Sequence, residues 1–338
     1  MTAVRFGVLG LGSIAQVVHL PILAQQHDVE ITAVCDADYD KARTIGGRIG
    51  TRVLRSDEEV YGADDIDAIV ICTPNYLHAP QAIAALEAGK HVLVEKPLAL
   101  SPEDARRVVA AARASDRVLM VAMNNRYRPD TLALKPFAEG GELGHVFLTR
   151  GAWLNKKMRL ARPTWRHRLA TAGGGALMDL GVQTLDLCLW TLGFPEAASV
   201  FCHLHTPPGA EVEDTAALLL RMADGSGISL TISWTLVAER DRHYMRLLGT
   251  RGSAMIQPLA IYKEGDNGLL DVTPALPTTG RENAYTASYR AELVHFVAAI
   301  RGDATVEPPA EQVGLMAIVE AAYRSAAERR EVEVAGAG

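Results

Sequence analysis

The feature that most constrains this chain is a glycine-rich turn that joins a short apolar strand to a helix near the amino end. The run from Val4 to Leu9 is apolar enough to be buried on both faces of a sheet, and the letters GLGSIA follow it directly. In this G-x-G-x-x-A pattern Gly10 permits a tight turn, Gly12 lacks the Cβ that would block a pyrophosphate, and Ala15 lets the helix pack closely. The helix start offers free N–H groups to phosphate. The predicted dinucleotide contacts in this turn are Gly10, Gly12, Ser13 and Ile14.

A carboxylate follows the second apolar run and bears on the choice of dinucleotide. This run extends from Ile31 to Cys35 and ends at Asp36. A carboxylate at that strand end can accept both ribose hydroxyls of an adenosine, and it repels a 2′-phosphate. The pattern predicts NAD as the cofactor, with NADP less favoured, and Asp38 strengthens the preference. The alternative is a glycine-rich surface turn followed by an unrelated strand-end carboxylate.

The composition is that of an ordinary globular protein. The 338 residues are enough for two domains, about half of them are hydrophobic, and the formal net charge is −6. Without a basic excess the chain is not expected to bind nucleic acid, and no apolar run is long enough to span a bilayer. The first strand begins at once and leaves no room for a signal peptide, while four scattered cysteines show no metal-ligand spacing. We expect a cytoplasmic protein with no metal ion and no membrane or nucleic-acid partner.

The first third of the chain alternates strands with helices. Six apolar runs separated by helical segments predict a parallel, doubly wound sheet in a domain that covers residues 1–124. Ligands bind such sheets at the carboxyl ends of the strands. Each polar cluster of the first third falls at that edge, and the clusters are Gly10 to Ser13, Asp36, Thr73 to Asn75, Glu95 to Pro97, and Asn124 to Tyr127.

From residue 125 onward the pattern changes to strands without helical crossovers. Runs over 146–153, 199–205, 216–222, 227–235 and 244–248 predict a large, mostly antiparallel open sheet in an α+β domain over residues 125–338. The letters ADGS at 223–226 predict a hairpin. Helices near 287–301 and 309–330 close the chain and could pack back on the first domain. The alternation in LTISWTL indicates a wetter sheet face that a partner subunit could cover.

Four motifs give the chain a specific resemblance. They are GLGSIA at 10–15, CTPNYLH at 72–78, AGKHVLVEKPLA at 88–99 and GGGALMDLG at 173–181. With these motifs the sequence resembles, over essentially its whole length, the Gfo/Idh/MocA oxidoreductases, the family of glucose–fructose oxidoreductase and inositol dehydrogenase. The resemblance implies a Rossmann domain and a C-terminal domain whose open sheet forms a homodimer or homotetramer. It also implies sugar, cyclitol or related polyol substrates that exchange a hydride with a nicotinamide cofactor.

Lys96 is the predicted acid or base of this chemistry. Oxidation of a secondary alcohol releases a hydride, which the cofactor takes, and a proton, which the protein must take. A partly desolvated lysine near a cationic nicotinamide should have a lowered pKa and could accept that proton; the alternative is a surface lysine at a strand end. The matching lysine of the family is catalytic and contacts substrate. Further cofactor contacts are predicted at Thr73, Pro74, Asn75, His78, Glu95 and Lys96, with Glu95 contacting the cofactor or positioning Lys96 and His78 starting a helix rather than catalysing.

The second half of the predicted site departs from the family pattern. The family shows Asp and, four residues later, His on one helix face, whereas this chain has Asp179 and Gln183. Glutamine can hydrogen-bond a hydroxyl but cannot titrate near neutral pH. Lys96 could therefore do the proton work alone while Asp179 and Gln183 orient the substrate; Tyr127 or His167 could replace the histidine; or the protein is no longer a simple dehydrogenase.

A cationic stretch from Asn155 to Arg168 stands out in this acidic chain. Its members are Lys156, Lys157, Arg159, Arg162, Arg166 and Arg168, with no acidic residue among them. By the resemblance it lies near the substrate mouth, where an arginine could bind a carboxylate or phosphate; a solvated loop or a subunit contact is the alternative. Trp165 could stack on a sugar ring or pack in a core. The predicted substrate contacts are Tyr127, Trp165, Arg166 and His167.

Three functions thus stay open, and we place them in order. The first is an NAD-dependent dehydrogenase or reductase acting on CH–OH groups of a sugar, cyclitol or sugar acid. The second is an enzyme that oxidises its substrate transiently within a non-redox net reaction, such as elimination or glycoside cleavage. The third is a nicotinamide-binding regulatory protein that has lost catalysis. His203 and His205 share a strand face, but without an acid or cysteine in register they predict no metal site.

Overall fold

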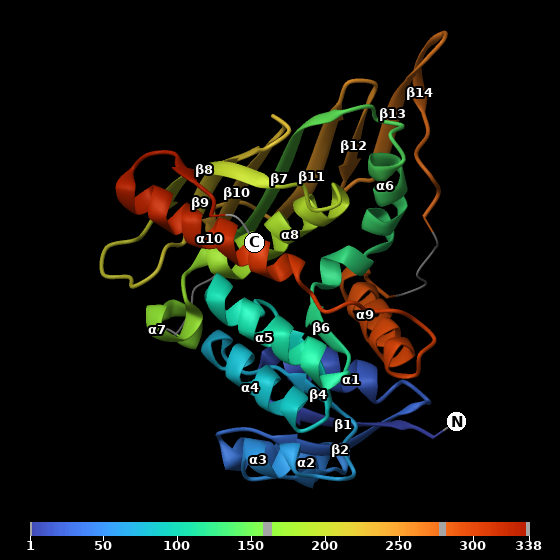
Figure 1. Cartoon of the computed structure of the whole chain (residues 1–338), viewed down its shortest axis with the longest axis vertical. Coiled ribbons are helices and arrows are strands. Elements are labelled where there is room, and N and C mark those ends of the chain that lie inside the picture. The colour runs from blue at the N-terminus through green and yellow to red at the C-terminus, as the bar shows by residue number, and fades with distance from the viewer. Residues whose placement is uncertain (1, 158–163, 277–281, 336–338) are drawn as a thin grey trace. The chain divides into compact units, whose positions relative to one another are not determined.

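The computed structural model describes residues 2–157, 164–276 and 282–335 (Figure 1). Its contacts divide the chain into two compact units. The first comprises residues 1–124 and 285–312, and the second comprises residues 125–284 and 313–338. The first helix of the carboxyl-terminal pair, α9 (Ala284–Ile300), therefore falls in the unit of the amino-terminal sheet from Tyr285 onward.

A six-stranded sheet forms the centre of the first unit. Its order is β3-β2-β1-β4-β5-β6 and all its pairs are parallel, which confirms the predicted doubly wound sheet. The strands are β1 (Val4–Leu9), β2 (Val29–Cys35), β3 (Arg52–Val53), β4 (Ala68–Ile71), β5 (His91–Glu95) and β6 (Leu119–Ala122). The order reverses between β1 and β4, so the glycine-rich turn after β1 lies at the point where such sheets bind ligands.

Helices connect these strands. They are the π-helical turn η1 (Ala15–His19), α1 (Leu20–Leu23), α2 (Tyr39–Ile49), α3 (Asp57–Tyr61), α4 (Asn75–Glu87) and α5 (Pro102–Ser115). Helices α2, α3 and α5 begin at side-chain caps formed by Asp38, Ser56 and Ser101. Helix α5 illustrates how these helices begin and pack. The Ser101 side chain accepts from the Asp104 N–H, and Pro102 occupies the first turn. The side chains of Val108 and Ala112 are buried. In α9, Phe296 packs edge-to-face on Phe6 of β1 in the core.

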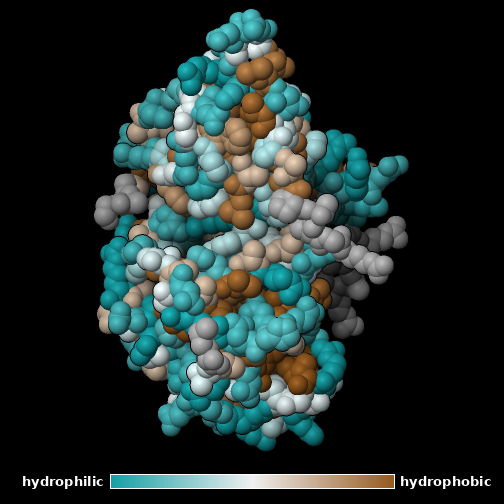
Figure 2. Space-filling model, turned by 90° about the vertical axis from the view of Figure 1, so that its right-hand side faces the viewer, coloured by the Kyte–Doolittle hydropathy of each residue, from teal (hydrophilic) through white to brown (hydrophobic). Residues whose placement is uncertain are grey.

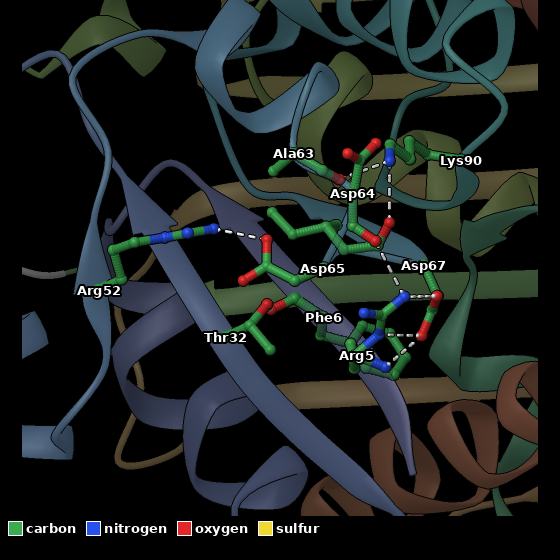
Figure 3. Close-up of polar contacts among 10 residues, drawn as sticks. Arg5, Phe6, Thr32, Arg52, Ala63, Asp64, Asp65, Asp67 and Lys90 are labelled. Carbon is green, nitrogen blue, oxygen red and sulfur yellow. Dashed lines mark hydrogen bonds and ion pairs between the residues drawn. The ribbon is translucent and has the colours of Figure 1, made fainter. Parts of the chain in front are cut away.

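Charged side chains at the amino edge of this sheet bind one another and the backbone (Figure 3). At the start of β1, the Arg5 guanidinium donates to both Asp67 oxygens, at 2.9 and 2.6 Å. Lys90, just before β5, is buried, and its Nζ donates to the carbonyls of Ala63 (2.7 Å) and Ile66 (2.9 Å). These contacts join the strand starts to the loop before β4.

The second unit contains a nine-stranded sheet in the order β14-β13-β12-β11-β7-β10-β9-β8-β15. Every pair is antiparallel except β10 with β7, which confirms the predicted mostly antiparallel sheet, and residues 223–226 form the predicted hairpin. The strands are β7 (Val146–Lys156), β8 (Ala197–His205), β9 (Thr215–Met222), β10 (Gly227–Leu236), β11 (Arg242–Gly249), β12 (Gly252–Ile256), β13 (Ala260–Gly265), β14 (Gly268–Asp271) and β15 (Val332–Glu333).

One face of the nine-stranded sheet is packed and the other is open. In β9, Leu218 and Leu220 are buried while Leu219 between them is 55% exposed, opposite the exposed Phe201 of β8. The helical elements of this unit are η2 (Asn124–Tyr127, which begins at the last residue of the first unit), α6 (Pro129–Glu139), η3 (Trp165–His167), α7 (Leu169–Ala172), η4 (Leu177–Gly181), α8 (Val182–Thr191) and α10 (Glu311–Glu328, whose first two residues fall in the first unit). Apolar patches interrupt a largely hydrophilic surface in Figure 2. Among the helices of the described residues, none has the length and apolar character needed to cross a bilayer.

Candidate active site

The glycine-rich turn is closed on the side of the sheet and open on the other. Gly10 has φ +83°, and a Cβ built there would lie 2.8 Å from the backbone of Cys72 and Thr73, so only glycine fits. A Cβ built on Gly12 would meet no atom within 4 Å. Ala15 is fully buried, as its packing role predicts. The turn is therefore open at Gly12 and the helix start formed by Ser13 and Ile14, where the sequence predicts a phosphate contact.

Asp36 is tied to this turn from the end of β2. Its Oδ2 accepts the Leu11 N–H at 2.7 Å and pairs with the Lys41 ammonium at 2.8 Å, and its Oδ1 accepts the Asp38 N–H. Asp38 itself caps α2 by accepting from the Lys41 N–H, so its carboxylate is already engaged in the helix start. The carboxylate expected to bind a ribose thus lies beside the expected pyrophosphate turn, and the two together fit a dinucleotide.

The segment after β4 carries the next group of predicted residues. Pro74 is the N-cap of α4, and Asn75 is the first residue of that helix. The Thr73 hydroxyl donates a hydrogen bond to the side-chain oxygen of Gln81. The side chains of Asn75 and Gln81 are both buried. His78 is 1% exposed, with Nδ1 2.7 Å from the Pro97 carbonyl and Nε2 2.8 Å from the Thr73 carbonyl.

The hydrogen bonds of His78 connect two loops. Both ring nitrogens thus lie within hydrogen-bond distance of a carbonyl oxygen, and burial lowers the pKa of His78 against the opposing effect of these contacts with Pro97 and Thr73. His78 thereby joins the loop after β4 to the loop after β5, and both loops carry residues predicted to contact the cofactor.

A buried histidine, His19, holds the glutamate of the E-K-P motif. The Nε2 of His19 lies 2.8 Å from Oε1 of Glu95, and both side chains are buried. Burial would raise the pKa of Glu95, but the hydrogen bond from His19 and the charges of His19 and Lys96 together hold it below its usual range. An ionised carboxylate only accepts, so His19 donates. The other oxygen, Oε2, accepts from the Lys96 N–H at 3.3 Å. Of the two roles predicted for Glu95, this contact favours positioning of Lys96 over contact with the cofactor.

His19, which ends the π-helical turn that follows the glycine motif, was not among the residues predicted from the sequence. Lys96 itself is half-buried directly after β5. The first unit thus gathers Gly12, Asp36, His78, Glu95 and Lys96 at the carboxyl edge of its sheet.

Asp179 and Gln183 lie together in the second unit. Asp179 is in η4, a π-helical turn that leads into α8, and its Oδ2 accepts from the Trp234 indole N–H at 3.2 Å. The buried Gln183 amide donates to the Asp179 carbonyl at 3.2 Å. Nothing local in the sequence pairs Trp234, 55 residues away, with Asp179.

Of the candidates to replace the missing histidine, His167 comes near this pair through Trp234. Its ring packs on the Trp234 ring with centroids 5.7 Å apart. Its Nδ1 accepts from the Thr164 N–H in a capping box, so Nε2 carries the proton of the neutral ring. Tyr127 is half-buried at the end of η2.

The cationic stretch is described in part. Arg159 and Arg162 lie outside the described residues, and the other four, Lys156, Lys157, Arg166 and Arg168, are exposed. The Arg166 guanidinium lies over the ring of Trp165, which is half-buried. The surroundings of Trp165 are therefore cationic.

No group of three or more His, Cys, Asp or Glu is placed to hold a metal ion within the part of the chain that the structure describes. Of the two histidines on β8, His205 pairs with Asp214 at 2.9 Å. The four cysteines are buried and free.

Two family models match the chain. One, described as "Oxidoreductase family, NAD-binding Rossmann fold", matches residues 4–123, and the other, described as "GFO/IDH/MocA C-terminal domain", matches residues 131–255. The D-glucoside 3-dehydrogenase of Escherichia coli (strain K12) is 28% identical over 350 residues, which cover 98% of this chain and 97% of that protein.

Solved structures resemble the whole chain. GenD2 from gentamicin A biosynthesis, in complex with NAD, has a TM-score of 0.86 and 29% identity over 99% of this chain and 97% of its own. Levoglucosan dehydrogenase in complex with NADH and L-sorbose has a TM-score of 0.88 and 25% identity over 99% of this chain and 100% of its own. The open glycine turn and Asp36 agree with the dinucleotides bound in both neighbours.

Proposed function

The chain belongs to the Gfo/Idh/MocA oxidoreductase family, and we propose that it interconverts a secondary alcohol and a ketone of a sugar, cyclitol or sugar acid. It is an NAD-dependent oxidoreductase, as the family model and the NAD and NADH complexes of its structural neighbours show. The observation that supports the proposal most is the carboxyl edge of the parallel sheet, where the open glycine turn, Asp36 and Lys96 follow three strands of one sheet. The names of the relatives supply the substrate class: a glucoside and levoglucosan are sugar derivatives.

Gly10, Gly12, Ser13 and Ile14 would hold the pyrophosphate and Asp36 the adenosine ribose. When bound, NAD supplies a hydride acceptor, and NADH a hydride donor. Lys96 would take the hydroxyl proton during oxidation and return it during reduction. The bond between His19 and Glu95, and that between Glu95 and the Lys96 N–H, support this role because they fix the backbone from which the lysine projects.

Asp179 and Gln183 would orient the substrate hydroxyls. Gln183 does not titrate, and its amide N–H₂ already donates to the Asp179 carbonyl, so it is suited to positioning rather than proton transfer. This supports the version in which Lys96 alone carries the proton. If another group takes the place of the absent histidine, the packing of the His167 ring on Trp234, which donates to Asp179, supports His167.

A substrate panel tests the proposal. Purified protein with NAD would be offered a D-glucoside, levoglucosan, myo-inositol and D-glucuronate while the absorbance of reduced nicotinamide is followed. Net reduction with at least one of them is expected, and a preference for the uronate would indicate that Arg166 or Arg168 binds its carboxylate. Product formation without net reduction would instead identify the transient-oxidation alternative.

Lys96→Met tests the role of the lysine, because methionine keeps the length and loses the ammonium. We expect kcat to fall roughly 100- to 10,000-fold, as for loss of an acid–base group, with the Kd for NAD little changed. Full activity in Lys96→Met would contradict the mechanism. The regulatory alternative predicts a different pair of results. The unaltered protein would show no detectable turnover, and Gly12→Val would still lose NAD binding.

We also infer that the open face of the nine-stranded sheet joins copies of the chain into a homodimer or homotetramer. Phe201 and Leu219 lie opposite each other on that face and are both about half exposed, which supports a covering partner. Light scattering coupled to gel filtration would measure the mass, and Leu219→Glu should dissociate the assembly.

A further inference from the structure

Glu213 is a buried carboxylate outside the site described above. It lies two residues before β9, and it is only 3% exposed. Both of its side-chain oxygens are 3.0 Å from the Gly175 N–H, and Oε1 also accepts from the Leu177 N–H at 3.0 Å and from the Tyr323 hydroxyl at 2.9 Å. Its main-chain carbonyl accepts from the Ala176 N–H at 2.9 Å. One residue therefore holds three consecutive N–H groups.

These N–H groups belong to the start of the helical segment that carries Asp179. The first N–H groups of a helix have no partner within it, and a side chain usually supplies one. Here the carboxylate comes from a segment 36 residues further along the chain, and its charge is favourable at the positive end of the helix. Glu213 thus acts as a remote cap for η4.

The glycine run at 173–175 is shaped to receive this cap. Gly173 ends α7 in the left-handed region, with φ +77°. A Cβ on Gly174 would overlap the Tyr323 hydroxyl, and a Cβ on Gly175 would overlap the Glu213 carbonyl. The glycines of this motif therefore permit close approach of the chain's own Glu213 and Tyr323.

Two connected paths lead from this cap to Asp179. The first is the turn itself, because the Asp179 N–H donates to the Gly175 carbonyl at 3.0 Å. The second passes through the next residue: the Asp214 carbonyl accepts from the Trp234 N–H at 2.9 Å, and the Trp234 indole donates to the Asp179 carboxylate. The segment 213–214 thus holds both the backbone and the side-chain partner of Asp179.

The buried carboxylate is a costly choice if its task is stability alone. Burial raises the pKa of Glu213, against the hydrogen bonds from Leu177, Tyr323 and Gly175, which lower it. Apolar residues often replace a buried ionisable group without loss of stability, so its use here is better explained by the geometry it imposes.

We propose that Glu213 is a positioning residue that fixes the glycine turn and thereby the orientation of Asp179 and Gln183 toward substrate. This inference rests on the proposed function of Asp179. It assigns no contact with substrate to Glu213.

The test compares Glu213→Ala with Glu213→Gln and with a matched core variant, Leu220→Ala, in the full-length protein. Leu220 is fully buried in β9, the strand that follows Glu213, and has no contact with the turn among those described above. With the most active compound of the panel, Glu213→Ala should lower kcat about 100-fold, the scale of a misplaced catalytic group, with the Kd for NAD unchanged. Glu213→Gln should recover most of that loss, because its amide oxygen still accepts from Gly175 and Leu177. Leu220→Ala should lower the Tm but leave kcat within about 2-fold.

Hydrogen exchange supplies a readout that does not depend on substrate. The peptide over residues 173–181 should exchange faster in Glu213→Ala, regain protection in Glu213→Gln and stay protected in Leu220→Ala. If Glu213→Ala behaves like Leu220→Ala in both assays, the positioning role is refuted. Should Glu213→Ala fail to fold, Tyr323→Phe removes one hydrogen bond to the carboxylate and should give the same changes at a few-fold level; unchanged kcat and exchange in that variant would also refute it.

Asp179→Ala separates this inference from the function it rests on. If Asp179→Ala keeps full turnover, the proposed role of Asp179 fails, and so does the positioning role. If Asp179→Ala is impaired while Glu213→Ala is not, only the inference about Glu213 fails. The kcat of the double variant, Glu213→Ala with Asp179→Ala, should be no lower than that of Asp179→Ala alone, because both changes remove the same contribution of Asp179 to turnover.

Discussion

Strand β5 has a lysine at each end, and the two lysines lie in different surroundings. At the amino end, Lys90 is buried and its ammonium is bound to the carbonyls of Ala63 and Ile66. At the carboxyl end, Lys96 is half-buried and follows Glu95, which His19 holds in place. Lys90 joins two loops of the protein, whereas the supports at the other end position a residue proposed to act on substrate.

The same contrast extends along both edges of the sheet. The amino edge is rich in charge, but its Arg5 and Asp67 satisfy each other (Figure 3). The carboxyl edge has a turn that is open at Gly12, and its carboxylates hold backbone N–H groups at Leu11 and Lys96. Charge density alone therefore does not locate the site. We infer that the open backbone at Gly12 and the hydrogen bonds that support Lys96 mark the proposed site.

The largest effect that we expect is on the affinity for NAD, and it comes from a substitution at the carboxyl edge. In Gly12→Val the new side chain would meet no protein atom at its Cβ, but it would point into the place that we propose for the pyrophosphate. The Kd for NAD, measured by calorimetry, should rise at least about 100-fold, or about 2.7 kcal/mol, with the Tm in the absence of NAD unchanged. Gly10→Ala is the control with the opposite behaviour: its φ and its overlap with Cys72 should lower the Tm itself. NAD affinity unchanged in Gly12→Val would remove the turn from the cofactor site.

The next largest effect concerns Lys90. Lys90→Met leaves the two carbonyls without their buried donor, which should lower the free energy of unfolding by about 2 kcal/mol in denaturant titrations. The Kd for NAD should stay the same. Lys96→Met is the matched control, with stability little changed and turnover lost. If Lys90→Met loses NAD affinity instead, the two edges are not functionally distinct.

The positions of these groups differ in how far the sequence could predict them. The six strands and their polar carboxyl ends followed from apolar runs such as Ala68–Ile71, because a strand buried on both faces is continuous in sequence. The short strands β12 to β14 were missed, since their few residues, exposed along all of β14, show no clear alternation. Both carboxyl-terminal helices were expected to be able to return to the first domain; α9 belongs to that unit from Tyr285 onward, whereas α10 belongs to the second unit from Val313 onward.

The side-chain braces of the site had no sequence signal of comparable strength. His19 and Glu95 are 76 residues apart, and Glu213 reaches a turn 38 residues before it. A buried polar pair depends on where the fold brings two segments, which periodicity does not encode. The motif GGG was noticed, but its physical reason, close approach of Tyr323 and Glu213, required coordinates.

A smaller effect sharpens the choice of cofactor at the carboxyl edge. Asp36→Asn keeps an acceptor for the Leu11 N–H but removes the charge that opposes a 2′-phosphate and that pairs with Lys41. The ratio of the Kd values for NADP and NAD should fall about 10-fold, or about 1.4 kcal/mol. Asp40→Asn, an exposed change on α2 next to Lys41, should leave the ratio unaltered. An equal change in both Kd values for Asp36→Asn would show that Asp36 binds without discriminating.

The smallest effect tests whether the charges of the amino edge act on stability alone. The hydrogen bond from Arg5 holds the pKa of Asp67 below its ordinary value of 3.8, more than burial raises it. The folded state therefore binds fewer protons than the unfolded state near that pH, and the stabilisation is present above pH 3.8 and is lost as the pH falls through the lowered pKa. Because the pair is about one-third exposed, Asp67→Asn should cost no more than about 1 kcal/mol at pH 7, and the two unfolding curves should converge toward pH 2. Asp64→Asn, whose main-chain carbonyl keeps its bond to Arg5, is the control, and a pH-independent difference for Asp67→Asn would show that the carboxylate charge is not what stabilises this edge.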